Sequence, residues 1–421
     1  MEQVATGTGA RIKSLDITRG VAVMGILSVN IVGMAMIQMA YFYPPAFGFD
    51  SAADHGLWLA NFLLVDGKLR SLFSMMFGAS TLLVIERAIA SGRSPARTHY
   101  ARMAVLLVIG YLHWLVLWWG DILTHYAAIG AIAFLFRKLK PKTLFITSAA
   151  ALLISGAPNI PMSVMRIAQY EKVQAGTADA ETVAQSEKSR ARYFPDAQAL
   201  AADDAAHESV PAHMKAMVHE EGPLAPFDLG PLWFETLGLM LLGMALYKTG
   251  FLTGALEPEV YRKTALVTIS TGLAGFGLAA WYAIANDYRP PYQMAAYGGF
   301  TQLIRPWMAT GYAALIILLS RRGQASGWWA DHVAAVGRAA FSNYLFSTMV
   351  GTLLFYGFAG DLFQKLSRFE AWLFVPPMWL AMLVWSKWWL DRFHYGPLEW
   401  VWRSLSRWQR QPMRRMAATG E

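Results

Sequence analysis

Apolar residues occur in long runs along most of the 421-residue chain, and short polar connections separate these runs. A helix needs about 20 mostly apolar residues to cross roughly 30 Å of bilayer hydrocarbon. We therefore expect an all-α, polytopic transmembrane bundle of about ten spans. The predicted spans are 17–40, 57–85, 103–119, 122–136, 143–162, 229–247, 264–285, 301–319, 337–357 and 370–390.

The second of these ranges is too long for one simple crossing. It contains the charged residues Asp66, Lys68 and Arg70 around Gly67. The pattern predicts a re-entrant or interfacial piece here, followed by a span that starts near Ser71.

Most of the 36 lysine and arginine residues lie in alternate connections between the apolar runs. Cytoplasmic connections of membrane proteins are enriched in these residues. The pattern predicts that both termini are cytoplasmic and that the protein spans a bacterial inner membrane. The first apolar run, from about Val21 to Ala40, reads as a retained helix, because it lacks a convincing small-residue cleavage site.

The spans divide the chain into four parts. Residues 1–162 form an N-terminal membrane half, and 229–390 form a C-terminal half. Between them, 163–228 is polar and is predicted to lie outside, either as a simple spacer or as a lid over a substrate site. A surface helix is expected around Ala197–His219.

The fourth part, 391–421, is a basic and aromatic tail. Three tryptophans alternate with three arginines in it: Trp400, Trp402, Trp408, Arg403, Arg407 and Arg410. This combination suits an interfacial segment on anionic lipid. We therefore expect membrane lipids as partners and no nucleic acid, although the net charge is +8. The absence of cysteine excludes thiol catalysis and thiolate metal sites.

Ionisable groups inside membrane spans are costly and usually face an interior cavity. Asp16, Arg19 and Asn30 share one face of the first predicted helix. They predict either a structural ion pair with a packing asparagine or the polar wall of a cavity.

Asp66, Lys68 and Arg70 form a second polar cluster, which Ser71 and Ser74 extend. Two cations at membrane depth are expected to bind a phosphate or carboxylate. The alternative is that Asp66 pairs with Arg70 at the i,i+4 spacing.

His113, Asp121 and His125 flank the predicted turn at Gly120. A histidine oriented by a carboxylate is the usual apparatus of general-base catalysis. Two other interpretations remain open, namely helix capping by Asp121 with packing histidines, and a metal site of two histidines and one carboxylate.

His55 lies at the outer end of the second range and is a further candidate catalytic residue. Ser342 and Asn343 enter an apolar span, where we expect them to hydrogen-bond neighbouring helices. Glu399 is expected to cap a helix or anchor the tail.

Five segments resemble the YeiB-like bacterial membrane proteins over nearly the whole chain outside 163–228. They are SLDITRGVAVMGILSVNI (14–31), GKLRSLFSMMFG (67–78), HWLVLWWGDILTHYAAIG (113–130), GRAAFSNYL (337–345) and FHYGPLEWVWRSL (393–405). The last two resemble the domain of unknown function that closes these proteins.

The resemblance extends to the transmembrane acyltransferase superfamily, which includes the lysosomal heparan-α-glucosaminide N-acetyltransferase. It implies transfer of an acyl group from acyl-CoA to an acceptor, through a histidine near the luminal side. His55 precedes Phe77 by a similar interval, but the intervening residues differ, whereas His113 and Asp121 fit the YeiB-type segment.

Three functions follow as hypotheses. The first is a membrane acyltransferase, with acyl-CoA near Arg19, Lys68, Arg70 and Asn30, and an envelope sugar or lipid as the unidentified acceptor. The second is a transporter for a small anionic or lipid-like substrate, and the third is a non-catalytic lipid or quinone binder. A homodimer is a further expectation.

Overall fold

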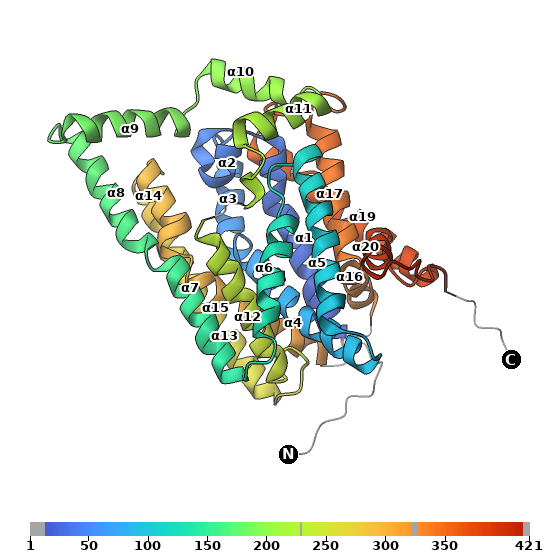
Figure 1. Cartoon of the computed structure of the whole chain (residues 1–421). Helices are drawn as coiled ribbons and strands as arrows, with labels where there is room; N and C mark the ends of the chain where they lie inside the picture. Colours follow the sequence, from blue (N-terminus) through green and yellow to red (C-terminus); the bar gives the residue numbers. More distant parts are fainter. Residues whose placement is uncertain (1–12, 228–229, 322–326, 416–421) are drawn as a thin grey trace.

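The computed structural model describes residues 13–227, 230–321 and 327–415, and these form a bundle of helices (Figure 1). The N-terminal half contains α1 (Lys13–Ala35), α2 (Gln38–Phe42), α3 (Ala52–Leu64), α4 (Lys68–Ala90), α5 (Pro95–Val116), α6 (Leu123–Ala133) and α7 (Pro141–Gly156). The C-terminal half contains α12 (Leu232–Lys248), α13 (Pro258–Ala285), α14 (Pro290–Met294), α15 (Ile304–Arg321), α16 (Trp328–Arg338), α17 (Ala340–Phe355), α18 (Arg368–Trp372), α19 (Val375–Arg392) and α20 (Pro397–Arg407).

Each of the ten predicted ranges contains a helix, and the predicted all-α membrane fold is confirmed. By length and composition, six helical segments of the described residues can cross a membrane, with α3–α4, α7–α8 and α18–α19 each counted as one segment. The number rises to seven if α14 and α15 count as one bent span. The helices in 122–136, 229–247 and 337–357 have fewer than 18 residues each and are short for a full crossing of the bilayer, so the count of about ten stays a prediction.

Helix α1 lies at the centre of the bundle, where it contacts α4, α15, α16 and α17. In the apolar stretch of α1, 61% of the residues are buried inside the protein, whereas the corresponding share is 33% for α5 and 28% for 141–174. Leucine, isoleucine and tryptophan side chains stay exposed on the outer helices, as expected for surfaces that face lipid. Helices from both halves of the sequence therefore share one core.

The predicted polar connection is largely helical. Helix α7 continues after a break into α8 (Asn159–Gln174), so the helical segment extends beyond the predicted boundary at 162. Helices α9 (Ala180–Tyr193), α10 (Ala197–Ala206) and α11 (Val210–Ala216) then cross one end of the bundle (Figure 1). The surface helix expected around Ala197–His219 is present as α10 and α11.

The opposite end of the bundle carries the α4–α5, α6–α7 and α12–α13 turns (Figure 1). These are connections in which the sequence concentrates arginine and lysine, and they lie together at one end of the bundle. That this end faces the cytoplasm stays a prediction. The chain ends at 1–12 and 416–421 lie outside the described residues.

Candidate cavity in the membrane bundle

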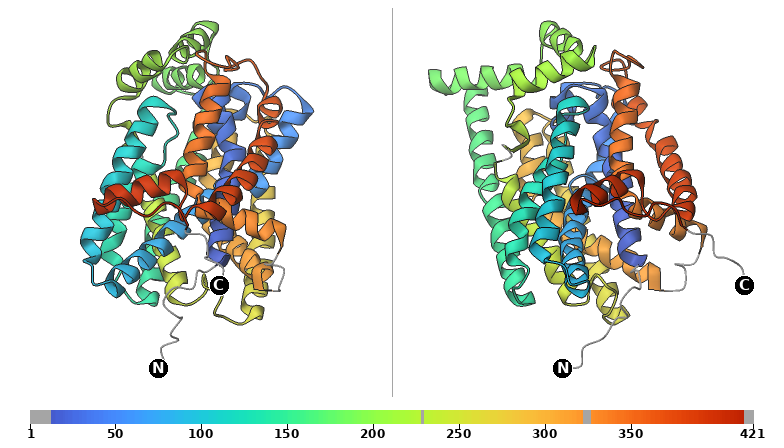
Figure 2. Two further views of the ribbon diagram at one scale, coloured as in Figure 1. Left: turned by 90° about the vertical axis from the view of Figure 1, so that its right-hand side faces the viewer. Right: turned by 45° about the vertical axis from the view of Figure 1, so that its right-hand side comes forward.

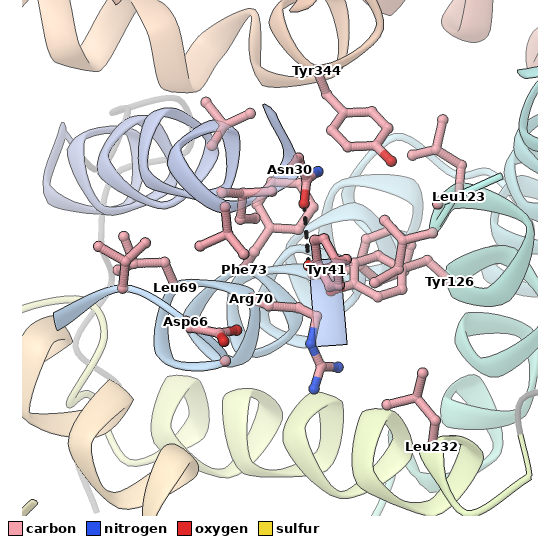
Figure 3. A pocket seen from close by; sticks show the side chains of 18 of the residues that line it. Asn30, Tyr41, Asp66, Leu69, Arg70, Phe73, Leu123, Tyr126, Leu232 and Tyr344 are labelled. Atoms are coloured by element: carbon pink, nitrogen blue, oxygen red, sulfur yellow. Dashed lines mark hydrogen bonds between the residues drawn. The ribbon is translucent and has the colours of Figure 1, made fainter. Parts of the chain in front are cut away.

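A cavity of about 340 Å³ lies inside the bundle (Figure 3). Aromatic and aliphatic side chains form most of its wall, including Phe73, Phe77 and Trp118. Its charged members are Asp66, Arg70, Glu235 and Arg305. Small-molecule sites commonly have this composition and occupy about 300–1,000 Å³.

Two interrupted helices meet at this cavity. The first interruption separates α3 from α4 at Val65–Gly67, where Gly67 has a φ of +72°. The second follows a π-helical turn, Ala295–Phe300, after which the chain bends by 54° into α15. Non-helical backbone at membrane depth is tolerated where it lines a cavity or is buried in protein.

Gly67 and Arg305 join the two interruptions. A Cβ atom on Gly67 would lie 2.4 Å from Cδ of Arg305, so only glycine leaves room for this side chain. The guanidinium of Arg305 donates a hydrogen bond to the carbonyl of Tyr297 in the π-helical turn. The helix is therefore interrupted around Gly67, where this glycine has a specific steric role, and the re-entrant or interfacial position of the preceding piece stays a prediction.

Arg70 pairs with Glu235 of α12 and not with Asp66. Its Nη2 lies 2.6 Å from Oε1 of Glu235, and Gln302 donates to the other carboxylate oxygen at 3.1 Å. Figure 3 shows Arg70 reaching toward α12. The i,i+4 pair considered from the sequence is thus replaced by a pair between helices, which Gly78 and Gly243 permit by bringing α4 and α12 into backbone contact.

Two guanidinium atoms at the cavity are buried without a hydrogen-bond partner among the described residues, namely Nη1 of Arg70 and Nε of Arg305. Two arginines and two carboxylates line the cavity, but in the described part of the chain only Arg70 and Glu235 of these four form a close pair. Buried donors without partners are costly, so an anion with hydrogen-bond acceptors would be stabilised here.

Asn30 lines the same cavity and accepts a hydrogen bond from the Tyr41 hydroxyl at 3.4 Å (Figure 3). Asp16 and Arg19 lie near the N-terminus of α1 and form an ion pair at 3.1 Å. Arg19 also donates to Ser80 at 2.9 Å. Of the predicted polar stripe, the structure therefore brings only Asn30 to the cavity.

Lys68 is fully buried but is not among the residues that line the cavity. Its ammonium donates to the carbonyls of Phe62 and Asp66, and it lies 3.1 Å from the ring centroid of Phe276. These contacts cap the end of α3, and they satisfy the Lys68 ammonium with groups of the protein.

His113 and Asp121 form a fully buried pair behind the cavity wall. Nδ1 of His113 lies 2.9 Å from Oδ1 of Asp121, and Oδ2 of Asp121 accepts from the backbone amide of Thr124 at 2.9 Å. Asp121 thus caps α6 and orients the histidine at the same time. Nε2 of His113 is buried without a hydrogen-bond partner among the described residues.

Tyr344 stands between this pair and the cavity. Its ring centroid lies 5.5 Å from that of His113, and its hydroxyl points into the space between the helices (Figure 3). His113 itself does not line the cavity.

The other two predicted histidines lie elsewhere. His125 on α6 is buried, with Nε2 at 2.9 Å from the Thr236 hydroxyl. His55 stacks on Phe49 with ring centroids 4.1 Å apart, and its Nε2 lies 3.2 Å from the Phe49 carbonyl. Neither residue lines the cavity.

Ser342 and Asn343 connect helices, as expected. Asn343 donates to Ser386 of α19 at 2.9 Å and accepts from the indole of Trp385 at 2.9 Å. Glu399 accepts from the amide of Phe341 and the hydroxyl of Ser342, at 2.8 and 2.5 Å. The tail therefore caps α17 through Glu399.

Sequence comparison finds bacterial relatives over nearly the whole chain. Over 405 residues the chain is 29% identical to the uncharacterised protein YeiB of Escherichia coli K12, covering 93% of this chain and 95% of that protein. It is also 29% identical over 413 residues to the uncharacterised protein YxaH of Bacillus subtilis 168, with 97% of each chain covered. The predicted resemblance to the YeiB-like proteins is confirmed.

Residues 246–409 match a family described as a protein of unknown function, DUF418. This match covers α13–α20 together with the end of α12, and it agrees with the resemblance of the C-terminal segments. No solved structure matches the chain. The chain is a multi-pass helical membrane protein with bacterial relatives, and the names of these relatives state no activity.

Glu235, Gln302 and Arg305 also line the cavity, and none of them was expected from the sequence to belong to a site. Glu235 and Arg305 lie within predicted spans, where ionisable residues usually face an interior cavity, so the argument that singled out Arg70 also applies to them. Tyr344 lines the cavity as well, directly after Ser342 and Asn343, a stretch that was expected only to connect helices.

Proposed function

We propose that this protein binds a small amphipathic anion inside the membrane and moves it across, as a transporter of the bacterial inner membrane. The observation that carries the proposal is the meeting of two interrupted helices at a cavity that contains Arg70 and Arg305. Interrupted helices at a central site are a recurring feature of secondary transporters.

The wall composition supports an amphipathic ligand. Phe73, Phe77 and Trp118 offer apolar contact for a hydrocarbon chain, and the unpartnered donors of the two arginines offer hydrogen bonds to a carboxylate or phosphate. Asp66 carries a negative charge at the same wall. It would oppose a second anionic group and so favour a ligand with one acidic head.

Binding is tested by native mass spectrometry of the detergent-purified protein with oleate and with oleyl alcohol, which has the same chain without the charge. We expect oleate to bind more tightly, and Arg305→Gln to lower its affinity about tenfold. Arg321→Gln, at the cytoplasmic end of the same helix, is the matched control. Equal binding of acid and alcohol would contradict an anion site.

Transport is tested separately by oleate flux into proteoliposomes. We expect flux with the native chain and its loss in the Arg305→Gln variant. Binding without flux would leave the third hypothesis, a lipid-binding protein, as the better description.

Acyl transfer is a second candidate, and the buried His113–Asp121 pair favours it. In this scheme acyl-CoA is the donor, the acyl chain occupies the cavity, and Tyr344 lies between the histidine and the chain. This second candidate predicts acyl-CoA hydrolysis or transfer that His113→Ala abolishes and His55→Ala leaves intact. Absence of turnover with acetyl- and oleoyl-CoA would exclude this candidate.

A further inference from the structure

Asp66 lies between two cavities. Besides the large cavity described above, a small one of about 20 Å³ has Asn61, Asp66 and Arg368 in its wall. Within the described ranges, Asp66 is the only charged residue that lines both cavities. The other residues that line both are Val29, Tyr41, Phe42 and Tyr297. Asp66 therefore belongs to the partition between the two spaces.

The small cavity lies toward one end of the bundle. Its wall includes Pro44, which follows α2, and Trp58 of α3. Both helices lie near the end that α9, α10 and α11 cross (Figure 1, Figure 2). A volume of about 20 Å³ has room for one water molecule, which the polar groups of Asn61, Asp66 and Arg368 can bind by hydrogen bonds. The small cavity thus offers a proton a polar approach to Asp66 from this end.

The carboxylate of Asp66 is not fixed by the cations near it. The cations that share a cavity or a hydrogen bond with Asp66 are Lys68, Arg70, Arg305 and Arg368. Arg70 pairs with Glu235, and the other three donate to backbone carbonyls. Tyr41 and Tyr297 are the titratable hydroxyl groups that line both cavities. In the part of the chain that the structure describes, no donor forms a hydrogen bond with the Asp66 carboxylate.

A bound anion changes the charge balance of the large cavity. Its charged residues are two arginines and two carboxylates, whose charges sum to zero. One anion adds a negative charge, and uncompensated charge inside a protein is costly. A proton on Asp66 removes that excess. Glu235 is less suited to this role, because a proton on it would disrupt its pair with Arg70.

We propose that Asp66 is the proton site of the transporter, so that one proton crosses the membrane with each anion. The proposal rests on the transport function given above. The proton comes from water through the small cavity, binds a carboxylate oxygen of Asp66 when the anion binds, and leaves with the anion on the other side. The neighbouring cations Lys68 and Arg368 favour the ionised carboxylate once the anion has left. Because no net charge crosses, the membrane potential neither drives nor opposes the movement.

Coupled binding is tested with decyl sulfonate, an amphipathic anion that keeps its charge between pH 5.5 and pH 8. Its affinity for the full-length protein in detergent is measured by native mass spectrometry at both pH values. Binding of proton and anion is reciprocal, so we expect about tenfold tighter binding to the native chain at pH 5.5. Asp66→Asn should bind equally well at both pH values, whereas Asp66→Glu should keep the pH dependence. Asp50→Asn, which removes an exposed carboxylate just before α3, is the matched control and should behave like the native chain.

Coupled movement is tested in proteoliposomes that contain a pH-sensitive dye. A sulfonate is too acidic to carry a proton through lipid by itself, so acidification of the interior after its addition reports transport by the protein. We expect acidification with the native chain and with Asp50→Asn, and none with Asp66→Asn.

The outcomes separate the two proposals. Anion binding that is independent of pH in the native chain, or equally dependent on pH in Asp66→Asn, would overturn the role of Asp66 and leave the proposed function intact. Sulfonate flux without acidification of the interior would do the same. Absence of anion binding at either pH would reject the proposed function and the proton coupling with it.

Discussion

Nη2 of Arg70 on α4 lies 2.6 Å from Oε1 of Glu235 on α12, so the cavity wall contains a buried ion pair between two helices. Glu235 is 2% exposed, whereas Arg70 borders the cavity. The pair fixes one arginine of the proposed anion site and leaves Nη1 of that arginine available to donate to a ligand.

Removal of one partner should destabilise the bundle. Glu235→Gln leaves Arg70 without its counter-charge, which costs about 3–5 kcal/mol for a fully buried pair and less here because Arg70 is partly accessible. The drop is measured as a lower midpoint of thermal unfolding in detergent. Glu259→Gln, which breaks an exposed pair with Arg262, should change stability by less than about 1 kcal/mol. An equal effect of both changes would mean that the inner pair contributes no more than a surface pair.

Gly67→Ala should disturb the anion site through Arg305. The left-handed φ costs about 1–2 kcal/mol for alanine, and the added Cβ collides with the arginine side chain. Gly92→Ala is the matched control, because Gly92 has a φ of +66° but no neighbouring atom within 4 Å of where an added methyl group would lie. We expect a similar backbone penalty from both variants, and weakened oleate binding only from Gly67→Ala. Unchanged oleate binding in Gly67→Ala would show that the position of Arg305 does not matter.

Helices α10 and α11, which cross one end of the bundle, should become less stable in acid. Burial and the neighbouring His207 lower the pKa of His213 on α11 to about 4. His213 is thus neutral in the fold, and its contribution to stability is complete above its ordinary pKa near 6.5 and is lost as the pH falls toward 4. Asp203 and Tyr356 also face this pair of histidines.

This loosening is measured by hydrogen exchange of α10 and α11 between pH 7 and pH 4.5, corrected for intrinsic rates. Protection should fall with pH in the native chain and should fall less in His213→Leu. His219→Leu, an exposed histidine of the same region, should behave like the native chain. Identical profiles in all three would remove His213 as the cause.

Much of the fold followed from the sequence, because each apolar run must become a helix to satisfy its backbone in lipid. The interruption at Gly67 was predictable because Asp66, Lys68 and Arg70 place three charged residues within an apolar run. The number of crossings did not follow, because a 16-residue helix such as α17 can pack inside the bundle without the length of a full span.

The site was only partly predictable, because partners come from distant parts of the chain. Local spacing suggested Asp66 for Arg70, but the partner is Glu235, 165 residues away. From the sequence, helix capping and histidine orientation were alternative roles for Asp121. In the structure one carboxylate oxygen contacts His113 and the other accepts from the amide of Thr124, so Asp121 has both roles. Lys68 drew attention as a cation at depth, yet backbone carbonyls and Phe276 hold its ammonium.

If the cavity beside Arg70 and Arg305 holds an amphipathic anion, the hydrocarbon chain of a bound ligand must contact the apolar wall. The most direct measurement is photo-crosslinking with a diazirine-bearing fatty acid, followed by peptide mass spectrometry of the labelled sites. We expect labels on cavity residues such as Phe73, Phe77 and Tyr126, and we expect excess oleate to remove these labels and Arg305→Gln to weaken them. Labels confined to the lipid-facing side chains of α5, α13 and α19, unaffected by oleate or by the variant, would contradict it.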